Sequence, residues 1–178
     1  MYKRQGNKVW DKTFGGSDTD YGYGLNVTTD GGYILTGYTK STDGDVNNNH
    51  GNSDIWVVKT DASGNKLWTK TIGGSSNDYS NCVTATTDGG CIVGGCSFSA
   101  DGDLSSNRGA VDLLAIKINA AGNSQTIKTY GGSYDDQPMA IIEFTSGRYV
   151  LAGSSASNDG NVSGNHGAYD AWILNVPF

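Results

Sequence analysis

The segment from Asp43 to Asp54 has the ligand spacing of a calcium-binding loop. Oxygen-bearing side chains occupy its first, third, fifth and seventh positions, and a carboxylate occupies the twelfth. Alternating oxygens of this kind wrap a hard cation such as Ca²⁺. The spacing occurs three times along the chain, so we predict Ca²⁺ as a cofactor. The predicted metal ligands are Asp43, Asp45, Asn47, Asn49 and Asp54; Asp101, Asp103, Ser105, Asn107 and Asp112; and Asp159, Asn161, Ser163, Asn165 and Asp170.

Two features of these loops favour a purely structural role instead. The twelfth residue is Asp rather than the longer, bidentate Glu, and the flanking residues predict strands rather than helices. Asp and Asn also cap tight loops by bonding to nearby backbone groups. The sequence leaves both interpretations open. If calcium binds, the loop that begins at Asp43, with three carboxylates, is expected to bind it best.

A second recurring carboxylate follows each Gly-Gly-Ser turn. Such a residue commonly accepts backbone N–H bonds where a strand begins. The functional alternative is one polar pocket per repeat, because loops on one rim of a repeat protein often form its binding face. Nearby tyrosines would suit a sugar, since a ring stacks on the sugar face while carboxylates and amides bind its hydroxyls. The predicted ligand-binding residues are Asp20, Asp78, Asp136, Tyr21 and Tyr79.

These groups recur because the chain repeats itself with a period of 58 residues. Asn7, Asn65 and Asn123 each begin a unit, and sixteen positions are identical in all three units. Most identical positions are Gly, Asp, Asn, Ser or Thr, which are the residues of turns and caps. A fixed period of this length is typical of repeat architectures. We predict a single domain over residues 1–178, with units at 7–64, 65–122 and 123–178.

The composition favours an all-β protein and argues against several partners. Of the 18 acidic residues 17 are Asp, Gly occurs 27 times, and no long apolar stripe has a helical period. The net charge of −6 argues against nucleic acid, which needs a clustered basic face. No apolar run approaches the ~20 residues of a membrane helix, and the first six residues lack the apolar core of a signal peptide. Cys82, Cys91 and Cys96 occur only in the second unit and are expected to be buried, unpaired thiols.

Each unit predicts four short strands joined by hairpins. In the second unit, residues 83–87 and 90–93 flank an Asp88-Gly89 turn, and residues 113–118 and 125–128 form the next hairpin. Pairing outward from the turn in the last unit predicts one face with Ile142, Phe144, Tyr149 and Leu151, and another with Ile141, Val150 and Ala152. A sheet that is apolar on both faces must be covered on both. Radial stacking of sheets in a β-propeller meets that requirement.

The two ends of the chain fit the same scheme. Residues 8–14 match the fourth strand of a unit, and residues 171–176 match the third. The last unit therefore lacks its fourth strand, and the N-terminal strand is expected to supply one by strand exchange. Such an exchange closes a ring and removes an exposed sheet edge.

Three stretches of the chain carry a family resemblance. They are Asn-Lys-Leu-Trp-Thr-Lys-Thr-Ile-Gly-Gly-Ser at 65–75, Thr-Thr-Asp-Gly-Gly at 86–90, and Asp-Gly-Asn-Val-Ser-Gly-Asn-His-Gly at 159–167, with Asp-Ala-Trp following at 170–172. This pattern resembles the Gly-Gly-Ser and Asp-Gly-Gly repeats of bacterial and archaeal surface β-propellers, and it covers residues 7–176. The resemblance implies a secreted or cell-surface, propeller-like module and names no activity.

Three units per chain are fewer than the four to eight blades of most propellers. We favour an arrangement in which two chains assemble head to tail into a six-bladed ring, each N-terminal strand completing the last blade of the other chain. A three-fold monomer such as a β-prism or β-trefoil is the rival. A fragment of a longer propeller is the third option.

The sequence carries no catalytic signature. It has no Gly-x-Ser-x-Gly elbow, phosphate loop or His-Glu-x-x-His motif. His50 and His166 occupy equivalent positions with Arg108 between them in register, which argues against a catalytic histidine. We predict a non-enzymatic extracellular module for adhesion or for binding ligands such as carbohydrates. The alternatives are a self-assembling structural block and, least favoured, a polysaccharide-active enzyme.

Overall fold

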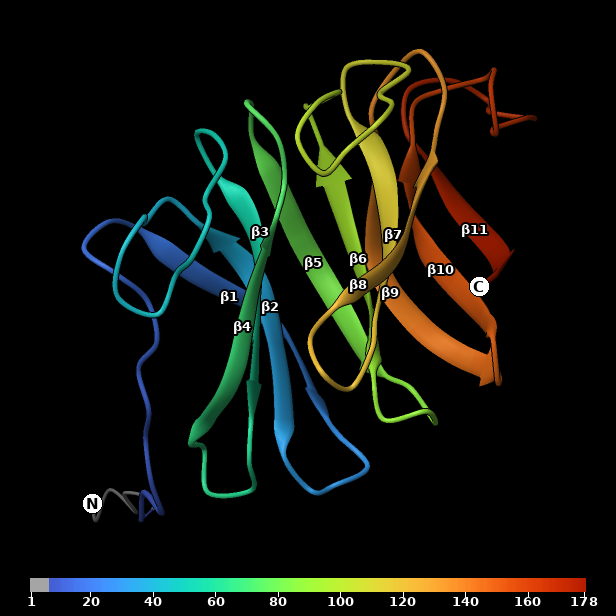
Figure 1. Cartoon of the computed structure of the whole chain (residues 1–178). Coiled ribbons are helices and arrows are strands. Elements are labelled where there is room, and N and C mark those ends of the chain that lie inside the picture. Colours follow the sequence, from blue (N-terminus) through green and yellow to red (C-terminus); the bar gives the residue numbers. More distant parts are fainter. Residues whose placement is uncertain (1–6) are drawn as a thin grey trace, which may run out of the picture.

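The computed structural model describes residues 7–178, so the first six residues of the predicted domain lie outside it. The described chain forms eleven strands in three antiparallel sheets, which confirms the prediction of an all-β fold. Within residues 7–178 there is no helix that is long and apolar enough to cross a membrane. The three sheets lie side by side like the leaves of a fan (Figure 1).

The sheets follow the three sequence units. Sheet 1 has the order β1-β2-β3-β4, sheet 2 the order β5-β6-β7-β8, and sheet 3 the order β11-β10-β9. Sheet 1 contains β1 (Asp20–Val27), β2 (Tyr33–Thr39), β3 (Asp54–Thr60) and β4 (Lys66–Ile72). Sheet 2 contains β5 (Asp78–Ala85), β6 (Cys91–Ser97), β7 (Asp112–Ile118) and β8 (Ser124–Tyr130). Sheet 3 contains β9 (Asp136–Thr145), β10 (Arg148–Ser155) and β11 (Asp170–Pro177).

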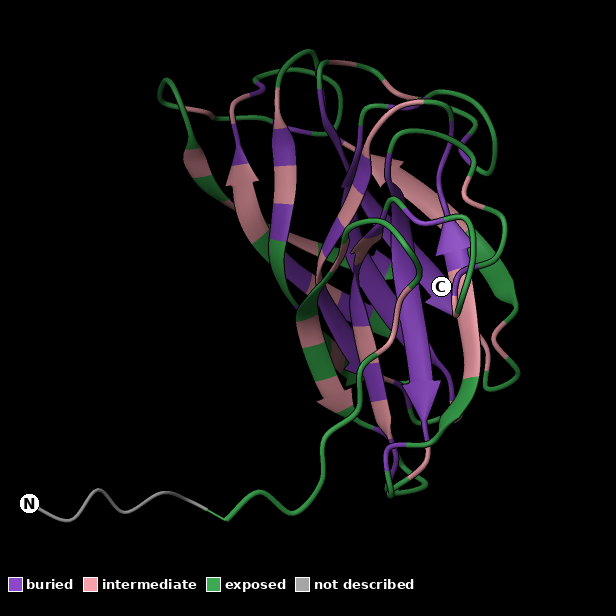
Figure 2. Cartoon of the chain, turned by 90° about the vertical axis from the view of Figure 1, so that its left-hand side faces the viewer, coloured by how far each residue is buried: buried purple, intermediate pink, exposed green. Residues whose placement is uncertain are grey.

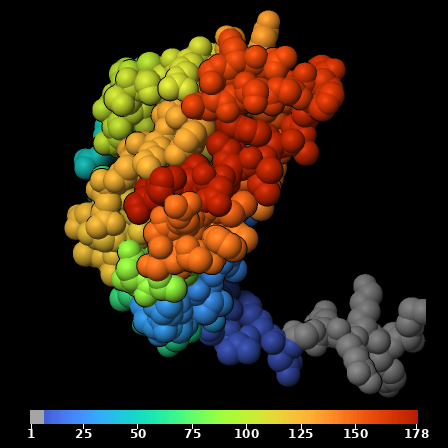
Figure 3. Space-filling view, turned by 90° about the vertical axis from the view of Figure 1, so that its right-hand side faces the viewer, coloured from blue at the N-terminus to red at the C-terminus, as the bar shows by residue number. Residues whose placement is uncertain are grey.

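Each sheet packs face to face against the next. Strand β5 lies against β1 and β2, and β9 lies against β5 and β6. Ile34 and Val57 of sheet 1 share an apolar core with Val93 of sheet 2, and Leu113 of sheet 2 shares one with Leu151 of sheet 3. Strands β6 and β7 are consequently buried along their whole length. Sheets 1 and 3 stand at the two ends of the stack, and residues of sheet 3 form the open surface in Figure 3.

The hairpins predicted at Asp30-Gly31 and Asp88-Gly89 are present. Their glycines have positive φ values of 81° and 82°, whereas neither aspartate is among the residues with positive φ. The turns are therefore not the two-residue type that needs positive φ at both positions. Instead, the N–H of the glycine donates to the carbonyl three residues earlier, from Gly31 to Thr28 in the first unit.

A β-bulge corrects the predicted faces of the last hairpin. Tyr149 pairs with Glu143 rather than with Phe144, because the strand contains one extra residue next to the turn. Beyond the bulge, Leu151 pairs with Ile141, so these two side chains share the buried face with Tyr149. The opposite face carries Ala140, Ile142, Val150 and Ala152.

Residues 8–14 form no strand in the single described chain, so their pairing in a strand exchange stays a prediction. A strand needs a partner, and this chain offers none at that place. The segment crosses the outer face of sheet 1 instead (Figure 2). Trp10 lies edge-on to Tyr33 with ring centroids 5.7 Å apart, and Lys12 Nζ donates to Asn65 Oδ1 at 3.1 Å.

The three cysteines are free and buried, which confirms the prediction. Burial raises the pKa of Cys82, Cys91 and Cys96 to about 12. The thiolate is the reactive form of cysteine, so these side chains are inert at neutral pH.

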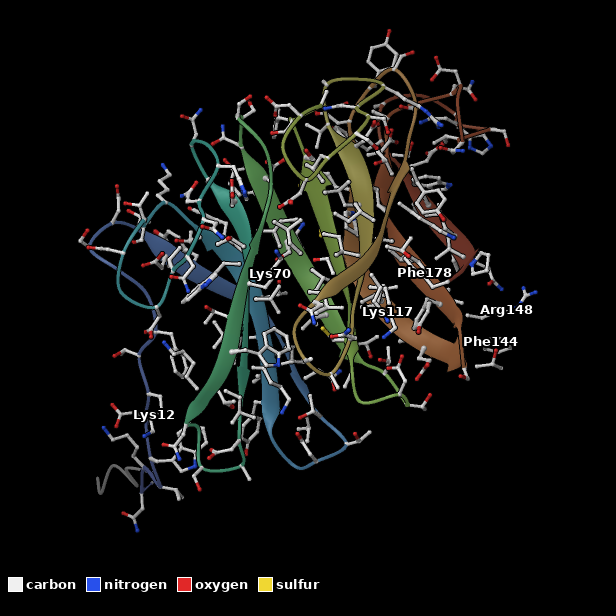
Figure 4. The ribbon with its side chains drawn as sticks, in the orientation of Figure 1. Lys12, Lys70, Lys117, Phe144, Arg148 and Phe178 are labelled. Atoms are coloured by element: carbon white, nitrogen blue, oxygen red, sulfur yellow. The ribbon has the colours of Figure 1, made fainter. Side chains whose placement is uncertain are left out.

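An ion pair between Lys117 and Asp88 stabilises the turn of the β5–β6 hairpin. Lys117 on β7 is nearly fully buried, close to Phe178 (Figure 4), and its Nζ donates to Asp88 Oδ1 at 3.0 Å. Lys59 and Asp30 repeat the pair in sheet 1. Desolvation opposes the ionisation of Asp88, but hydrogen bonds from Thr86, Lys117 and Gly90 outweigh it and lower the pKa of Asp88 to about 2.

We expect Asp88→Asn to lower the free energy of unfolding at pH 7 and to lose that effect in acid. A carboxyl with a lowered pKa in the fold stabilises the protein above its unfolded pKa of about 4. That contribution is lost as the pH falls through about 2. The side chain is 56% exposed, so solvent screening limits the effect to about 1 kcal/mol or less. Urea unfolding of both proteins at pH 7, 4 and 2 measures it, and a difference that is equal at all three pH values would contradict the expectation.

Candidate functional site

The carboxylates that begin the three calcium-like loops bind the backbone of the Gly-Gly-Ser turns. In each unit the Oδ1 atom accepts a hydrogen bond from a serine N–H 26 residues earlier in the chain. These serine hydrogen bonds lower the pKa of each carboxyl. The pairs are Asp43 with Ser17 at 2.7 Å, Asp101 with Ser75 at 2.8 Å, and Asp159 with Ser133 at 2.7 Å.

The third loop position binds the first glycine of the same turn. Its side-chain oxygen accepts the glycine N–H in all three units: Asp45 from Gly15 at 3.3 Å, Asp103 from Gly73 at 3.4 Å, and Asn161 from Gly131 at 3.3 Å. Asp45 also pairs with Lys66 Nζ, and Asn161 with the Arg108 guanidinium.

The remaining loop positions have separate roles. At the seventh position, Asn49, Asn107 and Asn165 donate Nδ2 hydrogen bonds to the last carbonyls of β2, β6 and β10, at 3.3, 3.1 and 3.0 Å. At the twelfth, Asp54, Asp112 and Asp170 accept a backbone N–H from the residue four positions earlier, at 2.9, 2.6 and 2.5 Å. At the fifth, Asn47, Ser105 and Ser163 are exposed.

The loops as folded do not present a calcium cage. A cation needs oxygen lone pairs that point to one centre, whereas the first and third positions accept N–H bonds from the Gly-Gly-Ser turn and the twelfth accepts one within its own loop. The charge of Lys66 beside Asp45 also opposes a cation there. Among residues 7–178, no three His, Cys, Asp or Glu side chains are grouped as metal ligands. Calcium binding stays a prediction from the sequence, which thermal unfolding with and without calcium would test.

The carboxylates after the Gly-Gly-Ser turns organise the backbone where β1, β5 and β9 begin. Asp78 is fully buried, and its Oδ2 accepts Gly74 N–H at 2.8 Å and Ser99 Oγ–H at 2.9 Å, while Oδ1 pairs with Ser97. Asp136 is also fully buried and makes the corresponding bonds to Gly132, Ser157 and Ser155. Asp20 makes them too but is only partly buried.

Two buried carboxylates face each other at each contact between sheets. Asp54 Oδ1 and Asp78 Oδ2 lie 2.5 and 2.8 Å from the point that a Cβ on Gly73 would occupy. Asp112 and Asp136 are placed likewise around Gly131. Asp54 Oδ1 and Asp112 Oδ1 have no hydrogen-bond partner among the described residues. Desolvation, together with the neighbouring negative charge, raises the pKa of Asp54 and of Asp112.

A cluster of aromatic rings lies where the inner strands of sheets 1 and 2 meet. The Tyr38 ring contacts Tyr21 at 5.2 Å and Tyr79 at 4.9 Å between centroids, so the two tyrosines predicted as ligand-binding are joined through a third. Tyr23 stacks in parallel on Tyr21 at 6.0 Å, and Phe98 lies edge-on to Tyr79 at 6.4 Å.

These rings border an open pocket whose lining also includes two amide side chains. We call it the tyrosine pocket; its lining residues are Tyr23, Tyr38, Tyr79, Asn81, Cys96, Phe98 and Gln137. They come from β1, β2, β5, β6, β9 and the loop after β6. Neither Asp20, Asp78 nor Asp136 lines it, because those acids are turned toward the loop backbone.

The sequence reasoning missed most of the tyrosine pocket, although the repeat contains a signal for it. Positions that recur in all units serve the fold, as the loop carboxylates show. The pocket residues break the recurrence: Tyr38 matches Cys96 and Ser154, and Phe98 matches Lys40 and Ala156. The fold therefore does not require aromatic rings at these positions, and their gathering in one place makes the pocket the candidate site.

The sequence of this chain is also similar to that of a known protein. No protein-family model matches the chain. The chain is similar to the regulatory protein FlaEY of Caulobacter vibrioides, with 24% identity over 181 residues. The similarity covers 94% of this chain and 19% of that protein, so the chain spans about a fifth of its relative's length.

Proposed function

We propose that this chain is a non-catalytic, extracellular β-propeller module that binds a neutral saccharide in the tyrosine pocket. Each sheet is then one blade, and β1, β5 and β9 are the strands nearest the axis. The face-to-face packing of the sheets and their consecutive strand order support this assignment. The location outside the cell rests on the family resemblance of the Gly-Gly-Ser and Asp-Gly-Gly repeats.

The lining of the tyrosine pocket is the observation that carries the proposal. Ligand sites are typically aromatic and apolar with a few polar groups that fix orientation. Tyr23, Tyr38, Tyr79 and Phe98 offer ring faces for the C–H surface of a sugar. The amides of Asn81 and Gln137 lie beside them to bind hydroxyls, and no charged side chain is among the lining residues. That combination favours an uncharged, hydroxyl-rich ligand over an ionic one.

We expect Tyr38→Ala to weaken saccharide binding at least tenfold, a loss of about 1.4 kcal/mol. Tyr38 contacts Tyr21, Tyr23 and Tyr79, so its removal takes away one ring and loosens the others. A glycan array with the unmodified chain identifies the saccharide, and isothermal titration calorimetry measures the affinity.

Two variants control for that measurement. Tyr38→Phe keeps the ring and is expected to retain most of the affinity. Tyr134→Ala removes an exposed tyrosine that does not line the pocket, so it should bind like the unmodified chain. An array without any saccharide bound, or equal losses in Tyr38→Ala and Tyr134→Ala, would contradict the proposed function.

A further inference from the structure

The outer face of sheet 3 is open to solvent (Figure 3) and carries exposed apolar side chains, among them Ile142 and Ile173. Ile173 on the edge strand β11 is 71% exposed. The residues at the same repeat position in the other sheets are Val57 and Ala115, and both are fully buried between sheets. Val150 is partly exposed, whereas its counterparts Ile34 and Ile92 are buried. The face that sheets 1 and 2 each present to the next sheet is thus left open on sheet 3.

The outer face of sheet 1 is the complementary surface (Figure 2). Leu25 is 63% exposed there, whereas its counterparts Val83 and Ile141 are each 6% exposed because the preceding sheet covers them. Leu25 borders an apolar hollow with Trp10, Phe14 and Leu35. Sheet 1 therefore lacks the neighbour that sheets 2 and 3 possess.

The N-terminal segment already lies where a neighbouring sheet would place its fourth strand. Trp68 of β4 packs against Gly122 in the turn of sheet 2, and Trp10 packs against Gly64 in the same turn of sheet 1. Residues 8–14 thus cross sheet 1 as β4 crosses sheet 2. Their backbone lacks the neighbouring strand that β3 provides for β4. The equivalent of β3 in sheet 3 is β11, which is an edge strand with no neighbour on its outer side.

The polar groups at the two ends also match. Between sheets 1 and 2, Asp54 faces Asp78, and His50 Nδ1 lies 3.9 Å from Asp103 Oδ2. At the equivalent positions of the two end sheets, Asp170 of sheet 3 would face Asp20 of sheet 1, and His166 of sheet 3 would lie near Asp45 of sheet 1. Sheets 1 and 3 lie at opposite ends of the chain, so one copy cannot make these contacts. Asp170 and Asp20 are both less buried than their counterparts because each lacks its partner.

We propose that two copies of this chain associate head to tail, the outer face of sheet 3 of each copy covering the outer face of sheet 1 of the other. Residues 8–14 of each copy then become the fourth strand beside β11 of its neighbour, and six sheets close a ring. The inference rests on the propeller arrangement proposed above but not on saccharide binding.

Light scattering coupled to size exclusion tests the association. We expect twice the 18.6 kDa chain mass for the unmodified chain and a single chain mass for Ile173→Asp and for Leu25→Asp. Both residues are exposed in one copy, so both variants should keep the circular dichroism of the fold. Leu67→Asp is the matched control, because Leu67 is exposed on the edge strand β4 and does not line the apolar hollow around Leu25; this variant should remain dimeric. An unmodified chain that is monomeric overturns the proposal, as does a dimeric Ile173→Asp or Leu25→Asp.

Mixing the two variants distinguishes head-to-tail pairing from other dimers. Leu25→Asp keeps an intact sheet 3 face and Ile173→Asp an intact sheet 1 face, so the mixture regains one intact contact and should show the dimer mass. If instead sheet 1 paired with sheet 1, or sheet 3 with sheet 3, only one of the two variants would be monomeric on its own. That result would also overturn the proposal.

A cross-link tests the position of the N-terminal segment. Val58 of β3 pairs with Thr69 of β4, and the equivalent pair in the ring is Leu174 with Asp11 of the second copy. We expect Asp11→Cys mixed with Leu174→Cys to form a disulfide-linked pair of chains on mild oxidation, while the three native thiols stay buried. Asp11→Cys with Ile173→Cys is the control, since adjacent side chains on a strand point to opposite faces. Equal cross-linking in both mixtures would refute strand exchange.

Discussion

Replacing Asp78 by alanine is expected to lower the free energy of unfolding by about 3 kcal/mol. The carboxylate is fully buried and accepts hydrogen bonds from Gly74 N–H and from the hydroxyls of Ser97 and Ser99. Its removal leaves buried donors without an acceptor, and each such group costs about 1–3 kcal/mol. Relief of the repulsion with Asp54 offsets only part of that loss. Chemical unfolding monitored by circular dichroism measures the change.

The repeat supplies the control for this variant. Asp20 makes the same bonds in unit one but is partly exposed, and its donor Gly16 is exposed, so water can replace the acceptor that the Gly16 N–H loses. Asp20→Ala is therefore expected to cost about 1 kcal/mol. Both variants belong in the Ile173→Asp background, because self-association would add its own stabilisation. Equal losses at the two positions would show that burial does not set the cost.

Replacing Gly37 by alanine is expected to cost at least about 3 kcal/mol or to prevent folding. A Cβ on Gly37 would overlap the carbonyl oxygen of Tyr21 and lie 2.7 Å from its carbonyl carbon. These are backbone atoms of the neighbouring strand β1, so no side-chain rotation relieves the clash. The strands would have to separate beside the bulge that lies between Gly22 and Gly24. Thermal unfolding is the measurement.

Gly22 is the matched control because it pairs with Gly37 across the same two strands. A Cβ on Gly22 would meet no atom within 4 Å. Gly22→Ala is expected to be neutral or to stabilise the fold by up to about 1 kcal/mol, since alanine restricts the unfolded chain. A destabilisation equal to that of Gly37→Ala would mean that chain flexibility, rather than the close approach of the strands, explains the loss.

The repeat made much of this fold predictable from the sequence. Gly-Gly-Ser and Asp-Gly mark turns, and apolar runs between them mark strands, so the hairpins on either side of Gly31 and Gly89 were expected where they occur. For Asp43 and Asp20 the sequence left a ligand-binding role and a structural role open, and their hydrogen bonds to the backbone agree with the structural one. These inferences succeed because turns and strand alternation depend on neighbouring residues.

The rest depends on contacts between distant residues, which a pattern of residue types does not encode. The bulge next to the turn at Gly147 shifts a register that simple pairing extends unbroken. The tyrosine pocket joins Tyr38 of sheet 1 to Phe98 of sheet 2, and only the packing of the sheets brings them together. Asp54 and Asp78 belong to different sheets, so they too face each other only because the sheets pack together.

The fan of sheets in Figure 1 has a consequence for symmetry. A contact between unlike faces is heterologous, and such a contact closes into a ring only when the rotation from one copy to the next divides a full turn. Three sheets that together span half a turn give a closed two-fold pair, whereas a narrower span gives a larger ring or an open filament. In the proposed association, the angle between neighbouring sheets, which depends on the apolar side chains packed between them, therefore determines whether this chain forms a closed particle or a fibre.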